Sequence, residues 1–430
     1  MTALHAPERE APPPLVAPRV VSFVWGALLV GLGTIPVLYA FISPRPFTSG
    51  PSPLAGLFPA SLRPAVASAS SLAVVALVGA IVVMALPVAR RLRHGGGAVL
   101  AGVLFGGASI ASVVLNGSTP GVGVFALPLA ILAIGLFPRP PLRWYERGLL
   151  LVLRFQVWGS LAAALAFPAW ALKHGYGAGV PGLTTRLAGV TPHPNALGPL
   201  AVALVVLEWR REPRHRPAVA VALVALVWTQ SKTSWAALGL IAGIALVGAL
   251  RRRAPARSVW PVVVLAGVIG ASAYVALGLA GEGQDTDKRE VSTETFTGRT
   301  AIWEVTLEVW QERPLIGHGA ALWNDQMDRR YRYRVGFPPG HAHNQLIQTL
   351  GQAGLLGAVP LVVFLAAFAA LARRADAVTR GVAGSLFLVL IVRCFSEPPL
   401  QSVVYGVSFF LSMATFGYVL IAANEAADDR

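Results

Sequence analysis

Long apolar runs that alternate with short arginine clusters are the feature of this chain that most limits its fold. Each run has roughly 16–25 residues, and a helix needs about 20 apolar residues to cross a bilayer. The composition agrees, because only 13% of the 430 residues are charged, whereas soluble domains average about 25%. The sequence therefore predicts an all-α, polytopic membrane protein.

The positive charge of the chain is concentrated between the apolar runs. The formal net charge is +15. The arginines gather in five clusters: Arg90, Arg91 and Arg93; Arg139, Arg143 and Arg147; Arg210, Arg211, Arg214 and Arg216; Arg251, Arg252, Arg253 and Arg257; Arg373, Arg374 and Arg380. Basic residues in short loops favour the cytoplasmic side of a membrane. The clusters therefore orient the spans, and we expect no binding to nucleic acid.

Twelve apolar segments are predicted to span the membrane: 19–43, 67–88, 97–115, 121–137, 148–171, 195–209, 217–230, 233–250, 259–280, 344–371, 381–397 and 401–423. With the N-terminus in the cytoplasm, all five arginine clusters fall on the cytoplasmic side. Residues 1–18 are predicted to be a disordered cytoplasmic tail, and residues 19–430 a single transmembrane domain. The loop 281–343 then faces outward.

This outward loop has a pattern of its own. Between residues 299 and 312, apolar and polar residues alternate as they do in an amphipathic helix, which we expect to lie on the membrane face. Pro314 and Gly317 end that helix. The loop is predicted to cover a cavity on the outer side of the bundle.

Two histidines lie where the loop enters the tenth span. The unperturbed pKa of imidazole is about 6.5, which makes His343 the residue best suited to accept a proton at neutral pH. The alternative is that His341 and His343 only cap the helix or lie at the interface. Side chains two residues apart on a helix point to different faces. We therefore rank His341, with the neighbouring Asn344, as supporting.

Two cations are candidates for binding an anionic substrate. Arg299 stands at the start of the loop helix with Trp303 one turn later, and its guanidinium offers forked donors to phosphate oxygens. Lys232 lies in the polar break Gln230-Ser-Lys-Thr-Ser234, where a charged residue often marks an aqueous cavity. The alternatives are a solvated or headgroup-binding Arg299 and a Lys232 that reaches to the surface.

The loop between the fifth and sixth spans contributes Arg186 and the stretch Thr191-Pro-His-Pro-Asn195. A rigid connector would also explain its proline content. Arg154, within the fifth span, is expected to reach the interface or to pair internally. Glu397 is a weaker candidate for lining the same outward cavity.

Signatures of several other enzyme classes are missing from the sequence. No outward carboxylates have the spacing of a divalent-metal glycosyltransferase, and neither a nucleotide-binding glycine motif nor a Gly-x-Ser-x-Gly turn occurs. The single cysteine, Cys394, excludes a disulfide within the chain. We expect no metal and no cofactor.

The motifs around the candidate residues resemble those of bacterial O-antigen ligases and Wzy-type polysaccharide polymerases. That superfamily has a His-Asn pair followed, after nine residues, by Gly-x-x-Gly, as in His343-Asn344 and Gly354-Leu-Leu-Gly357. A Gly-Arg…Trp helix before a Pro-x-x-Gly-x-Gly turn is matched by Gly298 to Trp303 and Pro314 to Gly319.

Two further motifs of the superfamily occur nearer the N-terminus. Its Arg…His-Pro-Asn stretch is similar to Arg186 with His193-Pro-Asn195. Its Ser-Arg turn is replaced here by Ser231-Lys232, which keeps the charge and loses the guanidinium fork. Within this resemblance, the sequence looks closer to the exopolysaccharide polymerases.

The resemblance implies a GT-C-like fold and a metal-independent, inverting glycosyl transfer at the periplasmic face of a bacterial inner (plasma) membrane. The donor would be a glycan on undecaprenyl diphosphate, held among membrane lipids. The acceptor would be a lipid-linked repeat for a polymerase or lipid A-core for a ligase. His343 would be the general base, and Arg299, Lys232 and Arg186 would bind diphosphate. The residues His341, Asn344, His193, Asn195 and Trp303 would support them.

We favour the polymerase, with the ligase as the alternative. A lipid-linked glycan flippase is a more distant possibility. It predicts charged residues near mid-membrane and two related halves of the chain, and neither is clear in the sequence.

Overall fold

The computed structural model describes residues 16–42, 45, 50–54, 56, 60–88, 94–174, 180–211, 214–251, 296–320, 322–324, 327, 329–331, 335, 340–400 and 406–428. The predicted span 259–280, the first part of the loop 281–343 and most of the tail 1–18 lie outside these residues.

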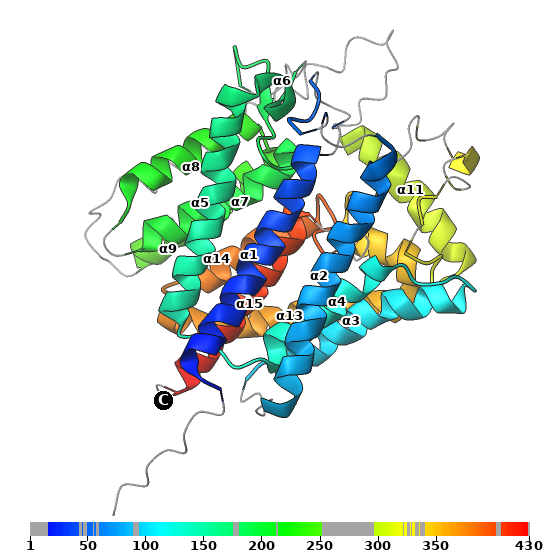
Figure 1. The fold of residues 1–430 in the computed structure, drawn as a ribbon, viewed down its shortest axis with the longest axis horizontal. Helices are drawn as coiled ribbons and strands as arrows, with labels where there is room; N and C mark the ends of the chain where they lie inside the picture. Colours follow the sequence, from blue (N-terminus) through cyan, green and yellow to red (C-terminus); the bar gives the residue numbers. More distant parts are fainter. Residues whose placement is uncertain are drawn as a thin grey trace, which may run out of the picture.

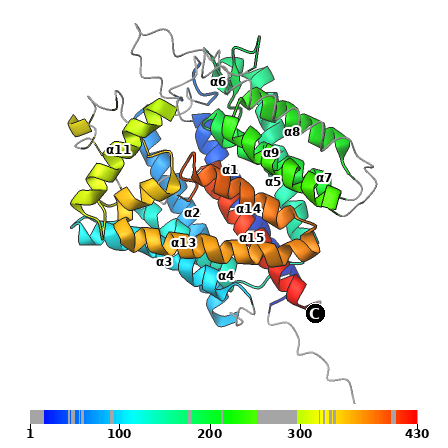
Figure 2. The same ribbon diagram turned by 180° about the vertical axis from the view of Figure 1, so that it is seen from behind.

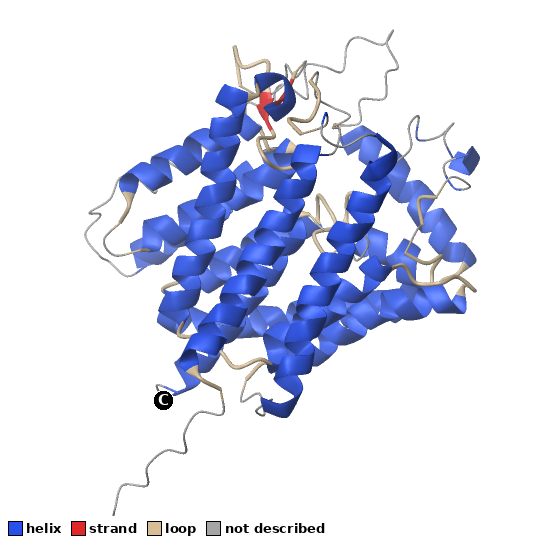
Figure 3. Cartoon of the chain, viewed as in Figure 1, coloured by secondary structure: helices blue, strands red, loops and turns tan. Residues whose placement is uncertain are grey.

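The described residues fold almost entirely into helices (Figure 3). The α-helices are α1 (Pro18–Ile42), α2 (Arg63–Ala85), α3 (Gly96–Leu115), α4 (Ala126–Leu136), α5 (Leu142–Ala166), α6 (Pro168–Ala171), α7 (Pro194–Arg210), α8 (Arg216–Thr229), α9 (Lys232–Arg251), α11 (Phe296–Glu312), α13 (Gln345–Thr379), α14 (Val382–Cys394) and α15 (Val407–Asp428). Short 3-10 turns are η2 (Ala60–Leu62), η3 (Leu86–Val88) and η4 (Val122–Phe125). One small antiparallel pair, β1 (Leu172–Lys173) with β2 (Arg186–Leu187), sets Leu172 opposite Leu187.

Six helices in the described part of the chain are long and apolar enough to cross a membrane, namely α1, α2, α3, α5, α13 and α15. Four shorter apolar helices lie at α4, α8, α9 and α14. Each of the eleven predicted spans on described residues contains a helix, although α13 continues to Thr379 where the sequence predicted an end at 371. The all-α membrane class is therefore confirmed, and the total of twelve spans stays a prediction.

The centre of the bundle is formed by α13 and α15, with α3 along one side of α13 (Figures 1 and 2). Phe416 of α15 packs edge-on against Phe364 and Phe368 of α13, with ring centroids 5.5 and 5.2 Å apart. α1 packs on α15, and α5 and α2 lie on either side of α1. α7, α8 and α9 form one end of the bundle, and α11 lies at the other (Figure 1).

A buried ion pair joins α5 to α7. The Nε of Arg154 donates to Oε1 of Glu208, whose side chain is fully buried. Leaving either charge unpaired inside a membrane is costly. Of the two expectations for Arg154, reaching the interface or pairing internally, the structure shows the internal pair.

The helix predicted at 299–312 is present as α11, but its apolar face packs against protein. Ile302, Val305 and Val309 are buried in a small cluster with residues of the following segment, including Leu322 and Tyr331. α11 also packs on α13. The expectation that this face rests on the membrane is therefore corrected, because the neighbouring protein surface buries it instead.

Candidate active site

The start of α13 fixes the backbone of the two histidines. The Oδ1 of Asn344 accepts hydrogen bonds from the N–H groups of Leu346 and Ile347, so Asn344 is the N-cap of α13. His343 directly before it has a φ of 50°. This left-handed conformation costs a non-glycine residue roughly 1–2 kcal/mol, and such strain is concentrated at functional sites.

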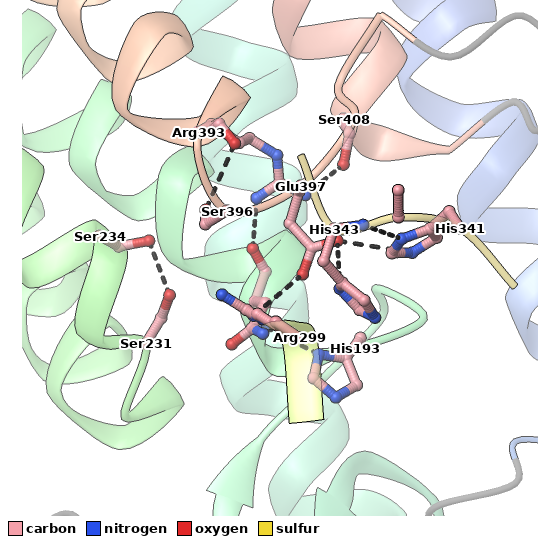
Figure 4. Close-up of polar contacts among 12 residues, drawn as sticks. His193, Ser231, Ser234, Arg299, His341, His343, Arg393, Ser396, Glu397 and Ser408 are labelled. Carbon is pink, nitrogen blue, oxygen red and sulfur yellow. Dashed lines mark hydrogen bonds and ion pairs between the residues drawn. The ribbon is translucent and has the colours of Figure 1, made fainter. Parts of the chain in front are cut away.

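Glu397 meets both histidines from a distant part of the chain (Figure 4). Its Oε2 lies 3.3 Å from Nδ1 of His343 and 3.4 Å from Nε2 of His341. The loop after α14 that carries Glu397 is held to the start of α13, because Leu400 N–H donates to Oε1 of Gln345 at 2.8 Å. The carboxylate is therefore positioned by two elements at once.

The two imidazoles face Glu397 with different ring nitrogens, so their neutral forms are different tautomers. The backbone N–H of His343 donates to Nδ1 of His341 at 3.2 Å, so a neutral His341 carries its proton on Nε2, facing Glu397. Nδ1 of His343 also faces the carboxylate. A proton held there leaves Nε2 of His343 with a lone pair, as a general base requires.

The charges of the cluster follow from burial and from these contacts. Burial lowers the pKa of His341 to about 4, although the negative charge of Glu397 raises it in part. Burial by itself would raise the pKa of Glu397, but its close contact with His343 and the positive charge of Arg393 hold this pKa well below its usual range. At neutral pH the cluster therefore combines a neutral His341 with an ionised Glu397.

Expecting His341 on a different face from His343 was wrong. The two rings are in contact, with centroids 4.1 Å apart. Residues 340–344 are not helical, so the helical spacing on which that expectation rested does not apply. A positive φ at His343 instead turns the chain and brings both rings to one carboxylate.

Arg299 approaches the cluster from the first turn of α11. Its Nη2 lies 3.9 Å from Oε1 of Glu397, and its side chain is 15% exposed. This separation exceeds that of a charge-assisted hydrogen bond, about 2.7–2.9 Å, and Nε of Arg299 is buried without a hydrogen-bond partner among the described residues. Trp303, one turn later, donates to Ala342 O at 2.7 Å and ties α11 to the histidine segment. Arg299 therefore has donors available for an anion.

Arg186 lies in β2 and is bonded to the start of α7. It is 3% exposed, and it donates to Thr229 O at 2.9 Å and to Oδ1 of Asn195 at 2.6 Å. Nδ1 of His193 accepts from Asn195 N–H and caps α7. Burial, with the neighbouring charge of Arg186, lowers the pKa of His193 to about 3. Arg186 therefore orders this loop, and its direct binding of a diphosphate stays a prediction.

Lys232 begins α9 immediately after a tight turn. Gln230 caps α8 with a φ of 49° and donates to Leu183 O and Thr185 O, while Ser231 and Ser234 share a hydrogen bond of 2.9 Å. The contacts of Glu397 given above come from Arg299 and the histidines and not from Lys232. The convergence of Lys232 with Arg299 stays a prediction.

Arg393 is a site residue that the sequence reading missed. Its guanidinium is buried and donates to Asn195 O and to Oγ of Ser408, the latter at 2.6 Å. Glu397 N–H donates to Arg393 O at 2.8 Å. Arg393 thus links the α7 loop to the carboxylate. An arginine inside an apolar run often marks a functional site, so Arg393 could have been selected as a candidate from the sequence.

His341, His343 and Glu397 bring their ligand atoms within 4.8 Å of one another, close enough to share a metal ion. A metal-ligating histidine normally donates its other ring N–H to a neighbour. Nδ1 of His341 instead accepts the His343 N–H, so this ring is arranged to face a carboxylate rather than a metal. Glu397 lies far along the chain, which is why no metal-site spacing was visible in the sequence. The expected metal independence stays a prediction.

The helices define a multi-pass membrane protein, and two histidines, a carboxylate and an arginine gather at one site in it. Residues 217–362 match the model of the family described as O-Antigen ligase. The chain is also 30% identical over 211 residues to the exopolysaccharide production protein ExoQ of Rhizobium meliloti (strain 1021), a match that covers 46% of this chain and 47% of ExoQ.

The chain thus spans about half the length of that curated relative. The two matches support the O-antigen ligase and polymerase superfamily as the family of this chain, which confirms the resemblance found in its motifs. The matched family segment contains His343, Arg299 and Lys232, whereas Glu397 and Arg186 lie outside it.

Proposed function

We propose that this protein is a membrane glycosyltransferase that moves a glycan from undecaprenyl diphosphate to a sugar hydroxyl at the outer face of the bacterial inner membrane. The family supports a ligase- or polymerase-type enzyme with lipid-linked glycan substrates. The observation that carries the proposal is the pairing of Nδ1 of His343 with the buried carboxylate of Glu397, because it leaves Nε2 as the basic atom of a base oriented by a carboxylate.

The chemistry follows from the charges of the cluster. Nε2 of His343 removes the proton from the acceptor hydroxyl, and the oxygen forms a bond to the anomeric carbon of the donor. The bond from that carbon to the diphosphate oxygen breaks, and the electron pair leaves with the diphosphate. Arg299 stabilises the negative charge that develops on the diphosphate. Lys232 provides a second positive charge for the same purpose. Direct displacement inverts the configuration of the anomeric carbon.

A polysaccharide polymerase is our first choice within this chemistry. The relative with 30% identity carries the name of an exopolysaccharide production protein. In a polymerase, the acceptor hydroxyl belongs to a second lipid-linked repeat. A ligase that uses lipid A-core is the second candidate, and the description of the matched family as O-Antigen ligase is what favours it.

A reconstituted assay tests the proposal. The purified protein is incubated with the lipid-linked repeat that accumulates in cells lacking it, with and without lipid A-core, and the products are sized. A polymerase forms a ladder from the repeat alone. His343→Ala should lower the rate by on the order of 10²–10⁴-fold, with membrane insertion and melting temperature unchanged.

Two results would decide against parts of this proposal. Products that form only when lipid A-core is present would favour the ligase. Normal transfer by a folded His343→Ala variant would remove the general base, and His341 and Glu397 would be the next residues to test.

A further inference from the structure

A cavity lined by both polar and apolar side chains lies beside the start of α2 and the end of α3, apart from the histidine cluster. Its volume is about 510 Å³, within the range of roughly 300–1,000 Å³ that is typical of small-ligand sites. Its polar lining comes from Ser68 and Ser71 of α2, from Asn116, Ser118 and Thr119 after α3, and from His318 and Asn324, and its apolar lining includes Val113, Val122 and Val124. The described residues that line it include no charged side chain.

The cavity is connected to the active site through α13. His318 N–H and Gly319 N–H donate to Gly351 O and Gln352 O, both at 2.9 Å. Asn116 donates to Gly317 O at 3.1 Å, and Oγ of Ser112 lies 2.7 Å from Gln352 O. Gly351 is six residues into α13 from its first residue, which amounts to roughly 9 Å along the helix axis. The cavity and His343 therefore lie along the same helix, within reach of one extended substrate.

The lining offers neutral hydrogen-bonding groups that the protein does not use itself. The hydroxyls of Ser68, Ser118 and Thr119 make no hydrogen bond within the described part of the chain. Nε2 of His318 donates to Val309 O at 2.7 Å, which leaves Nδ1 as an acceptor. Hydroxyl and imidazole groups without charge suit the hydroxyls of a sugar. A diphosphate would require cations.

We propose that this cavity is a subsite for an oligosaccharide segment of the substrate, at a distance from the bond that reacts. The inference rests on the proposed glycosyl transfer and extends it. The oligosaccharide belongs either to the donor or to the acceptor, and both present the same hydroxyl-rich chemistry to the cavity.

A blocking substitution tests the subsite. Gly121 lines the cavity, has a φ of −65°, and a Cβ added to it would meet no atom within 4 Å. Gly121→Trp should therefore fill the cavity without straining the backbone. Gly107→Trp is the matched control, because Gly107 in α3 has equal space and does not line the cavity.

Two measurements are made on both variants in detergent. Binding is measured with the oligosaccharide released from the lipid-linked repeat by mild acid. Transfer is measured with the donor varied at fixed acceptor, and then with the acceptor varied at fixed donor. Gly121→Trp should weaken oligosaccharide binding and raise KM in one arm by about tenfold or more, the effect of losing one or two neutral hydrogen bonds. The affected arm identifies whether donor or acceptor uses the subsite.

Equal binding and equal KM in Gly121→Trp and Gly107→Trp would overturn the subsite, even with normal transfer by the wild type. Oligosaccharide binding that is lost in Gly121→Trp would support the subsite, even where the wild type transfers nothing and the proposed reaction fails. If Gly121→Trp melts lower than its control, the double variant Ser118→Ala, Thr119→Ala replaces it, and an unchanged KM in that variant would count against the subsite.

Discussion

At the scale of single residues, the proposed chemistry depends on which atom of His343 carries a proton. Glu397 faces Nδ1 of that ring, so removing its charge should disturb the base without removing it. We expect Glu397→Gln to lower kcat by on the order of 10²–10⁴-fold, with a much smaller change in KM. Steady-state kinetics on the folded variant measure both constants.

A double variant separates this positioning role from other effects of Glu397. In a His343→Ala background, Glu397→Gln should lower the rate little further, because residues that act as a unit are not additive. Equal losses in both backgrounds would mean that Glu397 acts through Arg299, which lies 3.9 Å away, and not through the base.

The neutral histidines make stability depend on pH. Folding lowers the pKa of His341 from 6.5 to about 4 and that of His193 from 6.5 to about 3, mainly because both are buried. Between those values the unfolded chain binds more protons, so stability is lost as the pH falls. The melting temperature in detergent should therefore decrease from pH 6.5 towards pH 4, and less steeply in His341→Gln. A melting temperature that is flat or rises over this range would contradict the burial of neutral histidines.

Sequence motifs selected His343 and Arg299 as candidates, because their spacing to Asn344 and Trp303 is local. The partners of these residues could not be predicted in the same way. Glu397 was rated weakly and Arg393 was missed, since both reach the site from the end of α14 and only packing of α14 beside α13 and α7 brings them there. The metal-like arrangement of two histidines and one carboxylate was invisible for the same reason.

At the scale of elements, the Gly354-Leu-Leu-Gly357 motif of α13 contacts the Pro314–Gly319 turn. Gly354 interrupts α13 with a φ of 56°, and the exposed N–H groups of Leu355 and Leu356 bind Pro314 O and Leu315 O, both at 2.9 Å. A Cβ at Gly354 would lie 2.5 Å from the carbonyl carbon of Leu315. The Pro314–Gly319 turn thus docks into the kink.

This contact predicts that adding one methyl group at Gly354 lowers stability. Gly354→Ala adds both a clash and a strained φ, each worth roughly 1–3 kcal/mol. We expect a lower melting temperature and loss of transfer, because α11 and Arg299 enter the site through this turn. Gly107→Ala, in open space on α3, is the control and should match the wild type. Equal melting temperatures for both variants would show that the docking is not tight.

Element boundaries were predicted well where turn chemistry was explicit. Pro314 and Gly317 mark the end of α11, and Asn344 marks the start of α13. The face that α11 buries was predicted wrongly, because an amphipathic pattern shows that a side is covered and not whether lipid or protein covers it.

At the scale of the whole molecule, the arginine clusters predict which ends of the helices face the cytoplasm. Cysteine labelling tests this prediction in a Cys394→Ser background, since Cys394 is the single natural cysteine. Ser118 and Arg143 are both exposed. Ser118→Cys should react with a membrane-impermeant maleimide in intact spheroplasts, and Arg143→Cys only after permeabilisation. Labelling of both from the same side would overturn the predicted orientation.

The sequence by itself determined the class of fold, because apolar length and charge distribution act locally and need no knowledge of packing. Its short motifs also located the histidine and arginine of the candidate site. Only the tertiary structure decided the partners of those residues. A carboxylate from the α14 loop, the arginine that anchors it, and the kink that receives the Pro314–Gly319 turn meet across long stretches of sequence. Burial and exact geometry, which set the charge and tautomer of a histidine, exist only once those segments have packed.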